Sequence, residues 1–210
     1  MAITTEQVKD LRDKTGVSIM QCRKALEEAG GDTEKAIIIL RKKSGDLAAK
    51  RVDRTFGAGT VQAYLHATGT VGAMVMLASE TDFVSGNDEF KALARDIAMH
   101  VTASKPKFLR KEDITEAERA QVKEVLIEEM KKAEAEKAAS EGKASKPKSA
   151  EMQEKILEGK LAAYFSEMVL LNQPFIKNPE ITIQGLIDGA VQKFGEKIEI
   201  SRFTRFAVGE

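Results

Sequence analysis

The sequence predicts an α+β protein, in which helices pack around an antiparallel sheet, and three observations support this fold class. Apolar residues repeat at helical spacing over the first 45 residues and again over much of the second half. Between residues 60 and 77 the period changes to two, in two runs separated by a turn that contains Gly69. A last alternating run, residues 197–208, predicts a third strand that joins this hairpin from the far end of the chain.

The first part of the chain, residues 1–45, predicts three short helices that form a small module. A unit of this size buries only a small core, which is typical of a docking module and not of an enzyme. Cys22 lies on the apolar stripe of the second helix and is expected to be a small core residue. The helices are expected to run from Thr4 or Thr5 to Gly16, from Ser18 to Gly30, and from Asp32 to Gly45.

Changes of pattern divide the rest of the chain into four parts. A charged, slightly basic linker, 46–56, precedes the first part of the core, 57–110, which holds the hairpin, a polar loop and a helix. Residues 111–150 are rich in Glu, Lys and Ala, and predict a charged helical insertion with a flexible tip over 138–149. Residues 151–210 complete the core with an amphipathic helix, a helix capped by Thr182, and the closing strand. A phase slip between Ile200 and Phe203 predicts a bulge in that strand, or a sheet covered on both faces.

Composition and charge exclude several classes of protein. Lys and Arg together number 33, as do Asp and Glu, so the net charge of zero argues against a strongly basic nucleic-acid binder. The single cysteine allows no internal disulfide, and two histidines with one cysteine make no metal cluster. We find no apolar run of 18 residues and no basic start followed by an apolar stretch, so we expect neither a membrane span nor a cleaved signal peptide. These features predict a cytoplasmic protein.

Candidate catalytic groups are few. Glu80 and Asp82 are two carboxylates two residues apart, but no histidine or third carboxylate is placed near them by spacing. The sequence also has no glycine-rich phosphate loop and no Gly-x-Ser-x-Gly motif. We therefore favour a solvated loop at Glu80 and Asp82, and a protein that is not an enzyme and needs no cofactor.

Nucleic-acid binding is an alternative that rests on the basic stretch of residues 41–54. Lysine and arginine there can contact phosphates, but only Phe56 and Tyr64 lie nearby, too few aromatic residues for base stacking. Basic residues also favour the end of a helix, because they complement its dipole. The hypothesis of an RNA- or ribosome-associated protein therefore stays open. It rests on six basic residues: Arg41, Lys42, Lys43, Lys50, Arg51 and Arg54.

Protein binding has more support. Phe83 lies in the segment Thr81, Asp82, Phe83 and Val84, between the second strand and the next helix. Pattern alone leaves two interpretations of this ring, one as a core residue under the sheet and one as an exposed anchor for a partner. Ile19 and Met20 lie in the first turn of the second helix and add apolar surface to the small module.

Six segments together resemble the family of bacterial translation elongation factor Ts. Residues 8–16, 20–26 and 31–37 are similar to the family's first signature, and residues 80–84 (Glu-Thr-Asp-Phe-Val) to its second and most specific one. Residues 173–175 and 202–206 resemble further family segments. The resemblance covers nearly the whole chain except residues 131–150.

This resemblance implies a fold and a function. Residues 1–45 would be a three-helix module like the ubiquitin-associated (UBA) domain, with Ile19 and Met20 near its contact with elongation factor Tu. Thr81, Asp82, Phe83 and Val84 would form a loop that intrudes beside the magnesium and phosphate site of that partner. GDP then leaves and GTP can rebind, with no bond made or broken. The insertion would be helical and coiled-coil-like.

Length and partners also follow from the resemblance. The chain stops at Glu210 and lacks the extra C-terminal helix of longer members, so it resembles the short form, which pairs with itself. A homodimer is expected, without membrane or direct nucleic-acid partners. Ser79 stands where the family often has cysteine, and residues 52–55 differ from the usual linker, but neither touches the implied mechanism.

Overall fold

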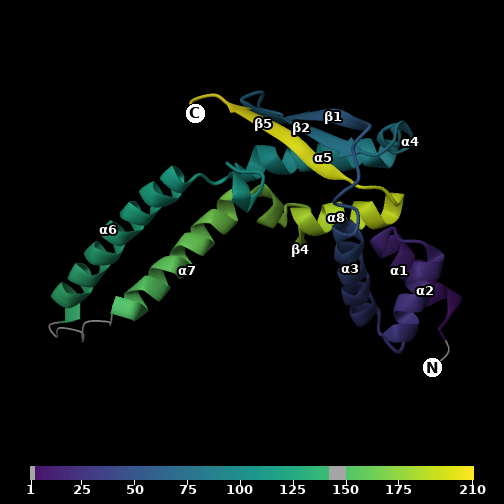
Figure 1. Ribbon diagram of the computed structural model, residues 1–210, viewed down its shortest axis with the longest axis horizontal. Helices are drawn as coiled ribbons and strands as arrows, with labels where there is room; N and C mark the ends of the chain where they lie inside the picture. Colours follow the sequence, from purple (N-terminus) through teal and green to yellow (C-terminus); the bar gives the residue numbers. More distant parts are fainter. Residues whose placement is uncertain (1–2, 142–149) are drawn as a thin grey trace. The chain divides into compact units, whose positions relative to one another are not determined.

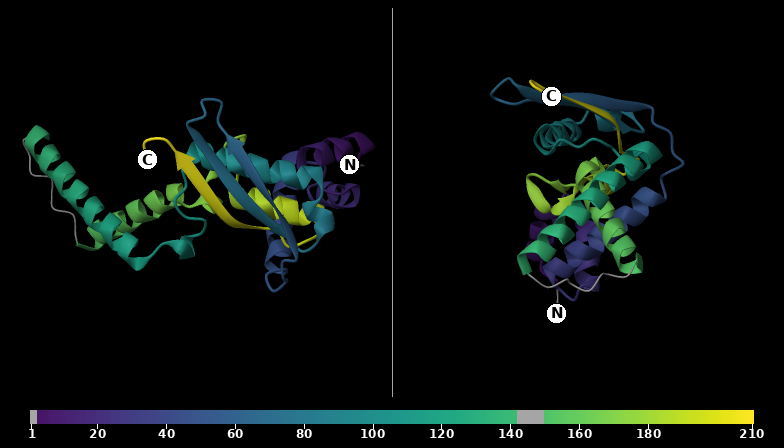
Figure 2. Two further views of the ribbon diagram at one scale, coloured as in Figure 1. Left: turned by 90° about the horizontal axis from the view of Figure 1, so that it is seen from above. Right: turned by 90° about the vertical axis from the view of Figure 1, so that its left-hand side faces the viewer.

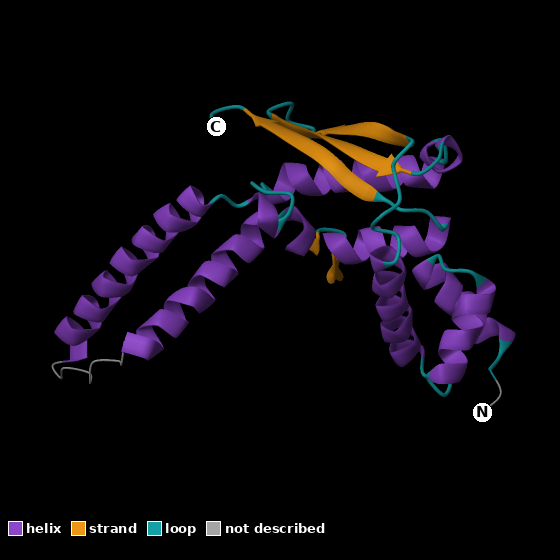
Figure 3. Ribbon diagram, in the orientation of Figure 1, coloured by secondary structure: helices purple, strands orange, loops and turns teal. Residues whose placement is uncertain are grey.

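The computed structural model describes residues 3–141 and 150–210, and it confirms the predicted α+β fold (Figures 1 and 3). The chain divides into two compact units. The first combines Met1–Lys105 with Pro174–Glu210, and the second is Pro106–Gln173. Within the described residues no helix is long and apolar enough to cross a membrane.

The first unit opens with helices α1 (Thr5–Thr15), α2 (Ile19–Glu28) and α3 (Thr33–Ala49). Their predicted N-caps are confirmed, since the side chains of Thr4, Ser18 and Asp32 each accept a hydrogen bond from a backbone N–H of the first turn. Gly16 ends α1 with φ +68°, a left-handed conformation that favours glycine. The core of the module confirms the predicted burial of Cys22: Val8, Leu11, Val17, Cys22, Ala25, Leu26, Ala36 and Leu40.

The third helix is longer than predicted, because Ser44 and Gly45 do not end it. Both lie against α8 (Ile183–Phe194), another helix of the same unit. The Ser44 hydroxyl donates to the Leu40 carbonyl at 2.9 Å and contacts the buried side chain of Gln192. A Cβ added at Gly45 would lie 3.8 Å from the Oδ2 atom of Asp188. Contacts with α8 thus hold both residues in the helix, so tertiary packing overrides their usual preference for a helix end.

The predicted hairpin and closing strand form one antiparallel sheet in the order β1-β2-β5 (Figure 2). Its strands are β1 (Ala58–Leu65), β2 (Val71–Ser79) and β5 (Glu199–Ala207). Met76 pairs with Arg202 but Leu77 pairs with Ile200, so Ser201 is an extra residue. The predicted bulge is therefore confirmed, and the third strand does come from the far end of the chain.

One face of the sheet is covered and the other is open. Helix α5 (Asp88–Ser104), the helix predicted after the hairpin and the polar loop, packs against β1 and β2. On the side facing α5, Ala73, Val75 and Leu77 are buried. The register places these apolar side chains on the opposite, exposed face: Val61, Leu65, Met74, Met76 and Phe206.

Shorter elements complete the first unit. Helix α4 (Asp82–Ser85) makes a single turn between β2 and α5. Helix α8 is capped by Thr182, as predicted, and ends at Gly195 with φ +72°. A small hairpin, β3 (Pro174–Phe175) with β4 (Asn178–Thr182), precedes α8 and has no counterpart in the prediction. Strand β3 has only two residues, too few to show a strand period, so the sequence pattern could not reveal this hairpin.

The second unit is a helical hairpin that begins with the short helix η1 (Lys111–Asp113). Helix α6 (Glu116–Glu141) packs along α7 (Ala150–Met168), which the short helix η2 (Leu170–Asn172) follows. Its core holds Leu157, Leu161 and Phe165. The sequence pattern assigns α7 to the core, whereas α7 packs with the insertion because it supplies the apolar partner that α6 needs. Of the predicted tip, residues 138–141 are helical and residues 142–149 lie outside the described residues.

Candidate partner-binding site

The segment of residues 81–84 projects its aromatic ring into solvent. The Phe83 side chain is 88% exposed, whereas its neighbour Val84 is buried. The interpretation of Phe83 as a core residue is therefore wrong, and the exposed-anchor interpretation agrees with the structure. Thr81 and Asp82 are also exposed, so the turn offers one large apolar group beside one carboxylate.

Local hydrogen bonds fix the direction of this turn. The N–H of Gly86 donates to the Asp82 carbonyl at 2.8 Å, and the Ser79 hydroxyl donates to the Thr81 carbonyl at 3.0 Å. Asn87 then caps α5 by accepting from the N–H of Glu89 at 2.8 Å. With Val84 buried and both ends tied, the ring of Phe83 faces away from the protein on a constrained backbone.

Glu80 precedes the turn and is engaged on all sides. Its carboxylate accepts from the N–H of Lys197 at 2.5 Å and from the Nη1 atom of Arg54 at 2.9 Å, with Arg51 at 3.5 Å. Burial raises the pKa of this carboxyl, but the N–H of Lys197 and the two guanidinium groups outweigh burial and hold the pKa below its ordinary value. A carboxylate kept ionised by three partners is a structural anchor, and it does not form an acid–base pair with Asp82.

A second carboxylate, that of Glu196, holds the same segment from the other side. It accepts from the N–H groups of Glu80 and Thr81 at 3.1 and 3.0 Å, and from the Thr81 hydroxyl at 2.5 Å. Sequence reasoning missed Glu196, which lies 115 residues from Thr81. It named Arg51 and Arg54 as possible phosphate contacts and missed their pairing with Glu80, at least 26 residues away. No spacing rule connects residues so far apart.

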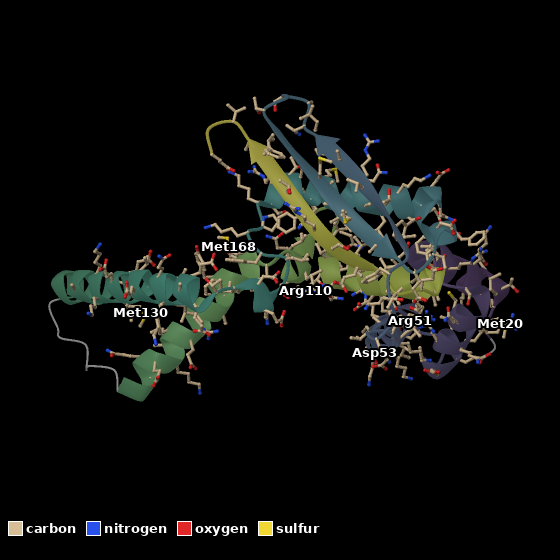
Figure 4. The ribbon with its side chains drawn as sticks, turned by 45° about the horizontal axis from the view of Figure 1, so that its top comes forward. Met20, Arg51, Asp53, Arg110, Met130 and Met168 are labelled. Atoms are coloured by element: carbon tan, nitrogen blue, oxygen red, sulfur yellow. The ribbon has the colours of Figure 1, made fainter. Side chains whose placement is uncertain are left out.

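The two predicted docking residues of the first module lie on its surface. Ile19 is 53% exposed and Met20 is 69% exposed, both in the first turn of α2 (Figure 4 labels Met20). On α3, Ile38 is exposed as well. The module therefore buries its own core and leaves separate apolar side chains exposed.

Most of the basic stretch is engaged within the chain. Arg51, labelled in Figure 4, and Arg54 pair with Glu80, while Lys43 pairs with Glu28 at 2.6 Å. Arg41 donates from its Nη1 atom to the Glu180 carbonyl at 3.2 Å. These contacts reduce the positive charge available to phosphates. Among the described residues, no group of three metal-ligating side chains is placed to hold an ion.

Comparison with known proteins agrees with the motifs. The family model described as "Elongation factor TS" matches residues 5–210. The chain belongs to the elongation factor Ts family. A relative of that name from Carboxydothermus hydrogenoformans is 46% identical, over 99% of this chain and 90% of its own length. Elongation factor Ts from Thermodesulfovibrio yellowstonii is also 46% identical, over 100% and 98% of the two chains. As a member of the family, the chain acts in translation elongation.

Proposed function

We propose that this chain is a guanine-nucleotide exchange factor that binds elongation factor Tu with GDP and promotes release of the GDP. Family membership supports elongation factor Tu as the partner. The observation that carries the proposal is the 88% exposed ring of Phe83 on a constrained turn. Large aromatic side chains that project from the surface on a constrained backbone are typical anchors of protein–protein interfaces.

In the proposed mechanism, Phe83 enters the partner beside its nucleotide site. The ring displaces partner elements that hold the magnesium ion and phosphates, and the carboxylate of Asp82 adds negative charge near them. Exchange factor and nucleotide then weaken each other's binding by the same factor, because the coupling free energy is reciprocal. GTP rebinds to the emptied site and releases the factor.

This mechanism asks nothing catalytic of the chain. No covalent bond changes, so no nucleophile, acid, base or cofactor is needed, and the protein is proposed not to be an enzyme. Thr81 and Val84 shape the turn, while Ile19 and Met20 are proposed to dock the first module on the partner. Translation elongation takes place in the cytoplasm, which is the compartment that we propose.

A homodimer is proposed through the exposed face of the sheet. Leu65, Met74 and Phe206 are 69%, 48% and 67% exposed there, on three neighbouring strands. Exposed apolar side chains gathered on one face of a sheet are typical of an interface, and self-association would cover them. Sedimentation equilibrium should find a dimer that Met74→Asp dissociates, whereas the exposed-site control Val125→Asp should leave it intact. A monomeric wild type, or a dimer indifferent to Met74→Asp, would refute this interface.

The experiment for the main proposal follows a fluorescent GDP analogue as it leaves elongation factor Tu. We expect the folded wild-type chain to accelerate release strongly, and Phe83→Ala to lose most of that effect. No acceleration would reject the exchange function. The RNA-binding alternative would then be measured with a fluorescent RNA, whose affinity should fall steeply with salt if phosphates are bound.

A further inference from the structure

We propose that Glu196 is a positioning residue for the exchange turn, and that its carboxylate sets the direction in which Phe83 points. The inference rests on the proposed function, because it explains how the exposed ring is kept ready for a partner. Glu196 lies after α8, between Gly195 and Lys197, and reaches the turn 115 residues earlier.

The backbone groups that Glu196 binds have no partner in the sheet. The pairing of β1 with β2 ends at Ser79, and the pairing of β2 with β5 ends at Ala78. The next two N–H groups, those of Glu80 and Thr81, both donate to the Oε2 atom of Glu196. The carboxylate therefore continues the hydrogen bonding of the strand after its last neighbour has ended.

Glu196 also binds the residue that precedes α4. Thr81 is the N-cap residue of α4, yet its side chain makes no capping hydrogen bond to that helix. Its hydroxyl donates to the Oε1 atom of Glu196 instead. A helix of four residues is not stable by itself, so the orientation of α4 depends on contacts from outside it. Glu196 supplies three hydrogen bonds to the two residues that lead into α4, those from the N–H groups of Glu80 and Thr81 and from the Thr81 hydroxyl.

The carboxylate of Glu196 is itself held in place by the residue that follows. The N–H of Lys197 donates to Glu80 at 2.5 Å, so Glu80 and Glu196 each bind the backbone of the other's segment. The Nζ atom of Lys197 donates to the carbonyls of Val52 and Arg54 and lies 4.6 Å from the centre of the Phe56 ring. These contacts restrict the Glu196 backbone and make its carboxylate a fixed support.

Charge-assisted hydrogen bonds suit this task because they are directional. Burial of an apolar side chain would hold the turn without fixing its rotation, whereas three donors converging on one carboxylate define an orientation. Loss of the carboxylate should leave the sheet and α5 intact, since their cores do not include it. The expected effect is a mobile Phe83 on a folded protein.

The test uses the absence of tryptophan from the chain, which makes Phe83→Trp a single fluorescent reporter at the site itself. In the free protein, we expect Glu196→Ala to lower the fluorescence anisotropy of this reporter, and Glu196→Gln to lower it less, because the amide oxygen can still accept. Glu128→Ala, which removes an exposed carboxylate from α6 in the other unit, is the matched control and should leave the anisotropy unchanged.

Exchange kinetics provide the second measurement, with Phe83 restored. Glu196→Ala should reduce the acceleration of GDP release by about tenfold or more, as expected when several charge-assisted hydrogen bonds are lost. Combined with Phe83→Ala, it should add little, because both changes act through one ring. Circular dichroism would verify that each variant is folded. If Glu196→Ala is unfolded, Glu196→Gln replaces it in the exchange measurement.

Two results would overturn the proposal: an unchanged anisotropy in both Glu196 variants, or losses of exchange that add fully to those of Phe83→Ala. Additive losses would mean that Glu196 contacts the partner directly or acts on a separate step. Failure of the wild type to release GDP would reject the proposed function instead. The anisotropy result would still stand in that case, because it is measured on the free protein.

Discussion

Replacing Phe83 with alanine separates the role of the ring in binding from any role in folding. With 88% of the side chain exposed, only about 12% leaves water when the chain folds. Complete burial of a phenylalanine is worth about 1.5–3 kcal/mol, so the loss of folding free energy should be at most about 0.4 kcal/mol. Alanine also favours a helix more than phenylalanine does, which offsets part of this loss. The melting temperature should therefore hardly change.

The effect on exchange should be far larger. A buried hot-spot ring contributes about 2–4 kcal/mol, which corresponds to a fall in the acceleration of GDP release by a factor of about 30 to 1,000. Rates would be measured with a fluorescent GDP analogue on elongation factor Tu at several concentrations of the variant. Saturation at a low rate indicates a lost wedge, whereas full recovery at high concentration indicates weaker binding alone.

Two controls make the comparison specific. Phe90, on α5, is fully buried, so Phe90→Ala should cost about 3–5 kcal/mol of stability. Ile176 is 48% exposed on the small β3–β4 hairpin, and Ile176→Ala should alter neither stability nor exchange. Wild-type exchange by Phe83→Ala would refute the wedge, and a loss of stability like that of Phe90→Ala would refute the assignment of the ring to the surface.

Three further predictions concern other side chains. Ile19→Asp should weaken binding to elongation factor Tu by about tenfold or more. It should not unfold α2, because a carboxylate is favourable in the first turn of a helix. Isothermal titration calorimetry would measure the affinity, and an unchanged affinity would exclude Ile19 from the docking contact. Glu80 has a lowered pKa when folded, so its contribution to stability is present above the ordinary pKa of about 4.3 and is lost as the pH falls through the folded value. Denaturant titrations should show wild-type stability falling more steeply than that of Glu80→Gln below this pH, and parallel curves would contradict the ion pairs. Burial raises the pKa of the Cys22 thiol, so iodoacetamide should label it slowly until denaturant is added, and rapid labelling of the native protein would contradict its burial.

Sequence reasoning succeeded where structure depends on neighbouring residues. The caps at Thr4 and Asp32 and the turn of the hairpin follow from chemistry within a few positions, and all are present. It failed at Ser44 and Gly45, where contacts with α8 decide the outcome. It also failed at α7, because the pattern of an amphipathic helix states that one face is buried but not against which partner.

The candidate site, too, could be predicted from the sequence only in part. The motif at residues 81–84 was visible, but its pattern left open whether Phe83 is a core residue or an exposed anchor. Only the placement of α4 between β2 and α5 decides between them. Glu196 was invisible because a glutamate after a helix C-cap is common, and its function depends on groups 115 residues away.

The aromatic ring of Phe83 stays exposed only if no buried position is available to it. Val84 already occupies the buried side of α4, and the ring cannot exchange with it without turning the helix. Turning α4 would break the hydrogen bonds of Thr81 to Glu196 and would strip donors from a carboxylate that is partly shielded from water. The loss of these charge-assisted hydrogen bonds opposes such a turn. The charged network beneath the turn thus explains why an apolar side chain points outward, and it predicts that weakening the network makes the direction of Phe83 variable.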